Sequence, residues 1–199
     1  MTGVGGPVEG RRVCACAIAE RAREAGVPPG VVKVVTTTGA GATGRVLWGD
    51  DRVRKLSFTG STAVGRTLYR QSAETLKKLT LELGGNAPLI VFDDADLHEA
   101  VAGTIASKYR NAGQTCVCAN RILVQSGIYD AFSQALVEAV RALPVGAGSE
   151  PGSKIGPLIN AAAIEKVDAL VADAVAHGGE VLCGGAHADA GPLFYQPTV

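Results

Sequence analysis

Cys116 lies in an uncharged stretch of small residues, N-A-G-Q-T-C-V-C-A-N, that spans residues 111–120. A loop cysteine beside a flexible glycine exposes its sulfur and lets a backbone N–H face the oxyanion formed when sulfur attacks a carbonyl. One interpretation is therefore a catalytic nucleophile, and the other is a small buried hydrophobic residue, as most free cysteines are. Cys118 is either a core residue or the partner of Cys116 in a disulfide that forms reversibly on oxidation.

Glu82 occurs in the alternating segment L-T-L-E-L at residues 79–83, which predicts a strand with Thr80 and Glu82 on one polar face. Open α/β sheets bind ligands at the carboxyl ends of their strands, where a carboxylate can act as a general base. The alternative is a solvated strand residue. A double glycine follows and leaves room for a substrate or cofactor ring.

The segment F-T-G-S-T at residues 58–62 ends a predicted strand and begins a predicted helix. Gly60 permits a tight turn, and the free N–H groups at the helix start suit a phosphate, to which the Ser61 hydroxyl adds a donor. The same residues also describe an ordinary helix N-cap. The small-residue loop at 39–44 does not match the G-x-G-x-x-G fingerprint of dinucleotide-binding proteins.

Arg110 stands at the end of a predicted helix, six residues before Cys116. A guanidinium in that position can bind a carboxylate through two hydrogen bonds. The alternative is a cation that stabilises a helix C-terminus.

The elements that must position these residues alternate strand and helix, which predicts an α/β protein with a partial Rossmann-like parallel sheet followed by part of an α/β catalytic domain. The Gly-rich residues 1–12 read as irregular, and the C-terminus as a strand. The double glycine at 84–85 divides the chain into a partial dinucleotide-binding domain (1–84) and a partial catalytic, thiol-carrying domain (85–199). Strands are predicted at 31–36, 54–58, 77–83, 89–92 and 121–125, and helices at 13–25, shortly after residue 44, at 62–73, 95–110, 128–143 and 161–177.

Composition excludes several functions for this chain of 199 residues. Lys plus Arg and Asp plus Glu number 19 each, so the chain lacks the basic surface of a nucleic-acid-binding protein. No apolar run is long enough to cross a bilayer, and the N-terminus has no apolar signal region, so we expect a cytoplasmic protein. Its five cysteines are expected to be reduced thiols rather than disulfides or a metal site.

The order of F-T-G-S-T, L-E-L-G-G-N-A-P and N-A-G-Q-T-C resembles the aldehyde dehydrogenase superfamily, and residues 108–125 resemble its succinate-semialdehyde dehydrogenase branch. The resemblance implies NAD or NADP as cofactor and a small-molecule aldehyde as substrate. It implies that Cys116 is the nucleophile, that Glu82 activates the water that hydrolyses the thioester, and that Gly60 and Ser61 face a cofactor phosphate. By the same resemblance Arg110 binds the substrate carboxylate, and Cys118 with Cys116 forms a redox switch.

Members of this superfamily are typically more than twice as long and form homo-oligomers. The matched part lacks their segments that hold the cofactor ribose and complete the oxyanion hole. Three interpretations follow: an NAD(P)-dependent semialdehyde dehydrogenase, a truncated inactive fragment, or a thiol- or nucleotide-binding module without turnover. The second predicts an exposed strand edge at residues 195–199 that makes the chain prone to aggregate.

Overall fold

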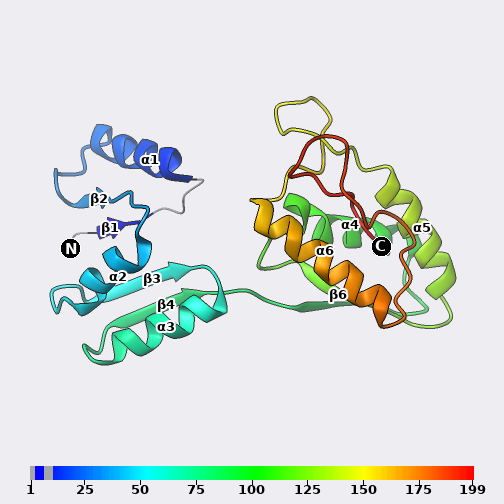
Figure 1. Cartoon of the computed structure of the whole chain (residues 1–199), viewed down its shortest axis with the longest axis horizontal. Helices are drawn as coiled ribbons and strands as arrows, with labels where there is room; N and C mark the ends of the chain where they lie inside the picture. Colours follow the sequence, from blue (N-terminus) through cyan, green and yellow to red (C-terminus); the bar gives the residue numbers. More distant parts are fainter. Residues whose placement is uncertain (1–2, 7–10) are drawn as a thin grey trace. The chain divides into compact units, whose positions relative to one another are not determined.

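The chain folds into two compact units, Met1–Glu82 and Leu83–Val199, seen in the computed structural model of Figure 1. The structure describes residues 3–6 and 11–199. Strands and helices alternate along both units and every pairing between named strands is parallel, which confirms the predicted α/β class. The assignment of a dinucleotide-binding role to residues 1–84 and a catalytic role to 85–199 stays a prediction.

The first unit contains two separate pairs of parallel strands, where the sequence predicts one sheet. On the inner face of the second pair, Leu56 opposes Leu79 and Phe58 opposes Leu81, while the outer face carries exposed polar side chains. The strand pairs are β1 (Gly3–Gly5) with β2 (Val32–Val34) and β3 (Lys55–Thr59) with β4 (Lys78–Glu82), and the helices are α1 (Arg12–Glu24), α2 (Ala40–Gly49) and α3 (Thr62–Ala73).

Two local predictions for this unit are wrong. Residues 3–5 form β1 although the Gly-rich start of the chain reads as irregular, because pairing with β2 uses backbone groups and needs no side-chain pattern. The rest of that stretch falls partly on residues 1–2 and 7–10, which lie outside the described residues. Helix α2 begins at Ala40, inside the predicted loop at 39–44.

The second unit pairs β5 (Ala87–Val91) with β6 (Ala119–Val124) and packs helices against them. Helix α4 begins where the Asp96 side chain accepts a hydrogen bond from the Glu99 N–H at 2.9 Å, a typical N-cap. Helix α6 is capped in the same way by Asn160. The helical segments are α4 (Leu97–Lys108), η2 (Arg110–Gly113), α5 (Tyr129–Arg141) and α6 (Ala161–Ala176).

Both hydrophobic clusters of the described residues belong to this second unit. The larger one centres on Phe132 and Val140 of α5, which pack with Val91 of β5 and Val101 of α4. The smaller cluster consists of Leu158, Ile164 and Tyr195. Ala112, just ahead of the candidate cysteine, packs against both clusters, so the loop that follows α4 is anchored on the core.

The C-terminal residues do not form the predicted strand with an exposed edge. The Val199 N–H donates to the Cys183 carbonyl at 3.1 Å, and the Leu182 N–H donates to the Val199 carbonyl at 2.9 Å. Tyr195 is buried, with only 7% of its surface exposed. Because these backbone groups already have partners within the unit, the segment is not an open edge for another chain.

Candidate active site

The candidate nucleophile lies on a loop, residues 110–118, that follows α4 and is called here the cysteine loop. Tyr109 anchors its start: the side chain is buried and its hydroxyl donates to the Thr198 carbonyl at 2.8 Å. Burial, with a smaller contribution from Cys183, raises the pKa of Tyr109 well above its usual range. Tyr109 therefore stays a neutral hydrogen-bond donor.

A left-handed turn opens the cysteine loop. Asn111, Ala112 and Gly113 have φ values of +53°, +53° and +75°. This region suits Gly and is tolerated by Asn, but for Ala it costs about 1–2 kcal/mol. The packing of Ala112 against both hydrophobic clusters offsets part of that cost.

Cys116 and Cys118 lie in opposite environments. Cys116 is exposed, whereas Cys118 is 1% exposed and its sulfur lies 3.8 Å from the Lys108 carbonyl. A turn bond from the Cys118 N–H to the Thr115 carbonyl brackets Cys116. Among the described residues, no acceptor takes the backbone N–H of Cys116 or Val117, so these donors remain available to a developing oxyanion. The redox role of Cys118 stays a prediction.

Gly85 contacts the backbone of Cys116 directly, and sequence reasoning missed this role. A Cβ added to Gly85 would lie 2.7 Å from the Cys116 carbonyl oxygen. Only a residue without a side chain fits there at the observed separation. The double glycine is the signal in the sequence, but it predicts room for a substrate or cofactor ring rather than this close backbone contact.

Arg110 is the first residue of η2 and its side chain is exposed. Its carbonyl accepts a weak hydrogen bond from the Thr115 hydroxyl at 3.5 Å, which closes the loop at its base. The structure thus places Arg110, Cys116 and Cys118 on one loop, and the substrate-binding role of Arg110 stays a prediction.

Glu82 and the Ser61 turn lie together at one end of the β3–β4 pair in the first unit. Thr59 is the register partner of Glu82, and the Gly60 N–H donates to the Glu82 carbonyl at 3.0 Å. Ser61 is the N-cap of α3, and its hydroxyl oxygen accepts from the Val64 N–H at 3.3 Å. Both sequence interpretations of Ser61 are therefore compatible, because a capping hydroxyl still has its own proton to donate.

This turn fits the phosphate of a dinucleotide. The first N–H groups of a helix have no partner within it, and α3 has twelve residues, enough for an effective dipole. A Cβ on Gly60 would collide with the ring of Phe58, so this turn is restricted to glycine while Phe58 stays in place. The donor set agrees with a phosphate, whose binding by Gly60 and Ser61 stays a prediction.

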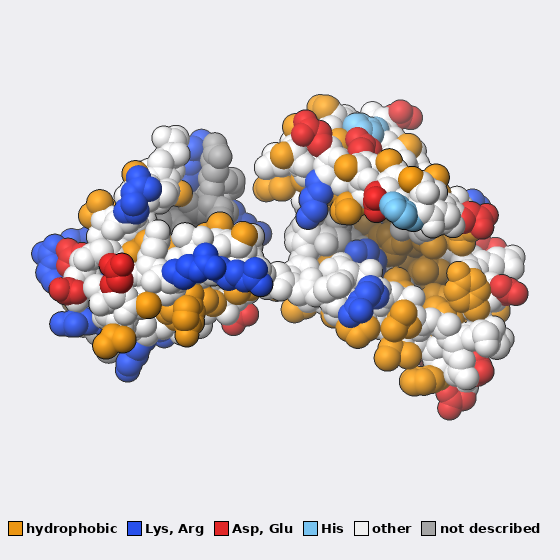
Figure 2. All heavy atoms as spheres, turned by 60° about the horizontal axis from the view of Figure 1, so that its bottom comes forward, with side chains coloured by type: hydrophobic (Ala, Val, Ile, Leu, Met, Phe, Trp, Pro, Cys, Tyr) orange, Lys and Arg blue, Asp and Glu red, His pale blue; other side chains and the backbone are white. Residues whose placement is uncertain are grey.

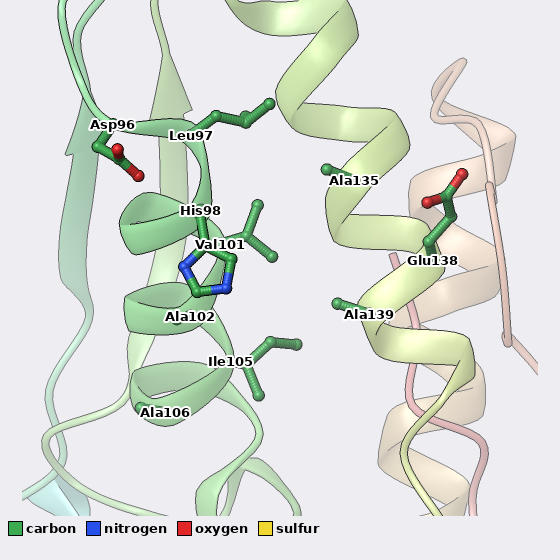
Figure 3. A pocket seen from close by; sticks show the side chains of 10 residues that line it. All are labelled: Asp96, Leu97, His98, Val101, Ala102, Ile105, Ala106, Ala135, Glu138 and Ala139. Carbon is green, nitrogen blue, oxygen red and sulfur yellow. The ribbon is translucent and has the colours of Figure 1, made fainter.

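A sizeable hollow lies elsewhere in the second unit. It has a volume of about 890 Å³ and runs between α4 and α5, where Val101 and Ile105 face Ala135 and Ala139 (Figure 3). Figure 2 shows hydrophobic side chains gathered on a hollowed part of this unit. The hollow is mainly apolar and contains none of the predicted site residues, so we do not assign it to the chemistry.

The residues that the structure describes contain no group of three or more His, Cys, Asp or Glu side chains arranged to hold a metal ion. They also contain no helix with the length and apolar character that crossing a membrane requires.

Fold and loop together define an α/β protein with parallel strands, a helix-start turn and an exposed thiol three residues after a left-handed turn. Comparison with known proteins then gives the family. The profile described as "Aldehyde dehydrogenase family" matches residues 3–199, and the chain belongs to that family. The resemblance seen in the three motifs is thereby confirmed.

Several relatives are semialdehyde dehydrogenases. The chain is 56% identical over 185 residues to the succinate-semialdehyde dehydrogenase (NADP(+)) GabD of Escherichia coli strain K12, covering 93% of this chain and 38% of that protein. It is 55% identical over 185 residues to a glutarate-semialdehyde dehydrogenase of Pseudomonas putida strain KT2440, again covering 93% and 38%. The chain thus spans little more than a third of the length of these relatives.

Solved structures agree with the fold. The succinate-semialdehyde dehydrogenase from Burkholderia pseudomallei superposes with a TM-score of 0.95 at 55% identity, covering 98% of this chain and 40% of that one. An E. coli structure described as an NADP-dependent enzyme gives a TM-score of 0.96 at 54% identity, covering 99% and 41%. Both units therefore have the folds of the corresponding parts of aldehyde dehydrogenases.

Proposed function

We propose that this chain carries the catalytic thiol, the general base and part of the cofactor site for NAD(P)-dependent oxidation of an aldehyde to a carboxylic acid. Its relatives named for succinate and glutarate semialdehyde point to a substrate with a carboxylate at the far end. The observation that carries the proposal is the exposed Cys116, whose own backbone N–H lacks an acceptor among the described residues.

Cys116 begins the reaction. Its thiolate attacks the aldehyde carbon, a C–S bond forms, and the carbonyl oxygen becomes an oxyanion that the free N–H of residue 116 can stabilise. An aldehyde carbon becomes a good hydride donor only after this addition makes it tetrahedral. The tetrahedral carbon would then lose its hydrogen as hydride while the oxyanion collapses to a carbonyl, which leaves a thioester on Cys116; NAD(P)+, when bound, would supply the hydride acceptor.

Glu82 completes the reaction in this proposal. Its carboxylate takes a proton from water, the water oxygen attacks the thioester carbon, and the C–S bond breaks to release the acid and regenerate the thiol. Gly60 and Ser61, at the same sheet end as Glu82, bind a cofactor phosphate through backbone N–H groups and the serine hydroxyl.

Arg110 selects the substrate. An exposed guanidinium at the base of the cysteine loop can pair with the carboxylate of a semialdehyde while the aldehyde group reaches the sulfur. The cofactor in this proposal is NAD or NADP. The cytoplasmic location and homo-oligomeric state expected from the sequence also stay predictions.

The direct test is formation of reduced nicotinamide from succinate semialdehyde, with NAD+ and NADP+ supplied separately. The chain is assayed alone and with the remaining segments of a family member added as a separate polypeptide. We expect absorbance of NADH or NADPH to rise, Cys116→Ala to abolish the rise, and Cys14→Ala, which removes an exposed thiol of α1, to leave it unchanged. No rise in either format would reject turnover by this chain and favour the inactive-fragment interpretation.

A further inference from the structure

The side chain of Gln114 joins the cysteine loop to a distant segment of the second unit. Its Nε2 donates to the carbonyls of Asn111 and Pro157, each at 3.3 Å. Its Oε1 accepts from the Ile159 N–H at 2.9 Å. We propose that Gln114 is a positioning residue that fixes the loop carrying Cys116, an inference that rests on the proposed function of Cys116 as the nucleophile.

The near side of this connection is a turn that needs a restraint. Asn111 and Ala112 have left-handed backbone conformations. For the alanine this conformation costs about 1–2 kcal/mol, so an unrestrained loop would relax to a right-handed or extended conformation. Asn111 and Gln114 are joined in both directions: the Asn111 Nδ2 donates to the Gln114 carbonyl at 3.1 Å, and the Gln114 N–H donates to the Asn111 carbonyl at 3.1 Å. Gln114 thus closes the turn two residues before Cys116.

The far side of the connection is anchored in the core. Leu158, between the two residues that Gln114 contacts, is 7% exposed, and its N–H donates to the Leu193 carbonyl at 2.8 Å. Asn160 follows and caps α6. Because this segment is tied to a buried cluster and to a helix start, it provides a fixed reference for the loop.

Only a primary amide meets both demands. The side chain must donate to two carbonyls and accept from one N–H, which a glutamine amide does with its NH₂ group and its oxygen. A glutamate side chain has the same shape, but its ionised carboxylate can only accept hydrogen bonds. It would therefore place an acceptor oxygen against the two carbonyl oxygens and form no hydrogen bond with them. Protonation returns one O–H donor, so Gln114→Glu should be defective when ionised and partly restored when protonated. The three partners are backbone groups, which do not titrate in this range.

The test measures amide hydrogen exchange in the full chain, using peptides that cover residues 111–118 and 157–160, at pH 8 and at about pH 3.5, which lies below the ordinary glutamate pKa of about 4.3. At pH 8 we expect residues 111–118 of Gln114→Glu to exchange about tenfold faster than in the wild type, because both donated hydrogen bonds are lost. At pH 3.5, where the introduced carboxyl is mostly protonated, the ratio should fall to about threefold or less. Intrinsic exchange changes equally with pH in both proteins, so the ratio isolates the side chain.

Two further variants complete the design. Gln114→Met lacks donor and acceptor, so it should exchange about tenfold faster at both pH values. Gln134→Glu adds the same charge at an exposed position of α5 and should match the wild type. A wild-type rate for Gln114→Glu at pH 8, or an equal acceleration at both pH values, would overturn the proposal. If Gln114→Glu does not fold, Gln114→Met decides, and a wild-type rate there overturns it.

Turnover separates this inference from the proposed function. If the chain oxidises aldehyde, Gln114→Glu should lower kcat about tenfold at pH 8 with little change in KM, because Gln114 orients the thiol without touching substrate. If the wild type shows no turnover, the proposed function fails, while the exchange ratios still decide whether Gln114 fixes the loop.

Discussion

Replacing Gly85 by alanine tests how closely the backbone of the cysteine loop packs against Gly85. The new Cβ would lie 2.7 Å from the Cys116 carbonyl oxygen, whereas ordinary van der Waals contact begins at 3.4 Å. Two backbones must therefore separate by about 0.7 Å. Overpacking of this kind costs about 1–3 kcal/mol, from which about 0.4–1 kcal/mol is recovered because alanine restricts the unfolded chain. We expect a net loss of about 1–2 kcal/mol.

Gly84→Ala is the matched control. No heavy atom lies within 4 Å of a Cβ added there, so only the effect on the unfolded chain remains and stability should hold or rise slightly. Urea unfolding followed by circular dichroism gives both free energies, and hydrogen exchange of residues 111–118 reports whether the loop moved. Equal stability of the two variants, with unchanged exchange in the loop, would refute the close seating of Cys116 on Gly85.

Three other predictions follow from single positions. Arg110→Ala should raise KM about tenfold or more for succinate semialdehyde but little for an uncharged aldehyde; equal effects in steady-state kinetics would reject carboxylate binding. Leu76→Gly should raise the unfolding free energy by about 0.5–1 kcal/mol in urea, because Leu76 is 90% exposed at φ +51°; a loss would contradict this. The hydrogen bond from His187 lowers the pKa of Asp168 in the folded protein. The stabilisation of the fold by this hydrogen bond is therefore present above the pKa of Asp168 in the unfolded chain, and it is lost as the pH falls through the lowered pKa of the folded protein. Asp168→Asn should therefore destabilise at pH 7 and not at pH 2; an equal deficit at both would oppose it.

The regular elements were predictable because each carries its own signals. Helix α5 was predicted at 128–143 and occupies Tyr129–Arg141, and α6 was predicted at 161–177 and occupies Ala161–Ala176. Apolar spacing defines such helices, and local side chains such as Asn160 fix where they start. The adjacency of Glu82 to the Ser61 turn was also within reach, since carboxyl ends of parallel strands share one edge.

The cysteine loop was not predictable in the same way. Residues 111–118 have no hydrophobic period, and the left-handed conformation of Ala112 opposes its local preference. Two of the hydrogen bonds that hold the loop join Gln114 to Pro157 and Ile159, more than forty residues away in sequence. Local propensity therefore identifies the cysteine but not the backbone conformation that presents it. It also does not decide that Cys116 is exposed while Cys118 is buried.

The strain in this loop explains why its supporting residues are glycines and amides. A turn that costs free energy persists only where several contacts fix it at once, and here these are the Gln114 hydrogen bonds, the packed methyl of Ala112 and the close approach of Gly85. None of these groups carries a reactive atom, yet each limits where the Cys116 backbone can lie. The position of the sulfur therefore depends on residues whose own chemistry is inert, so their substitution should change reactivity before it unfolds the chain.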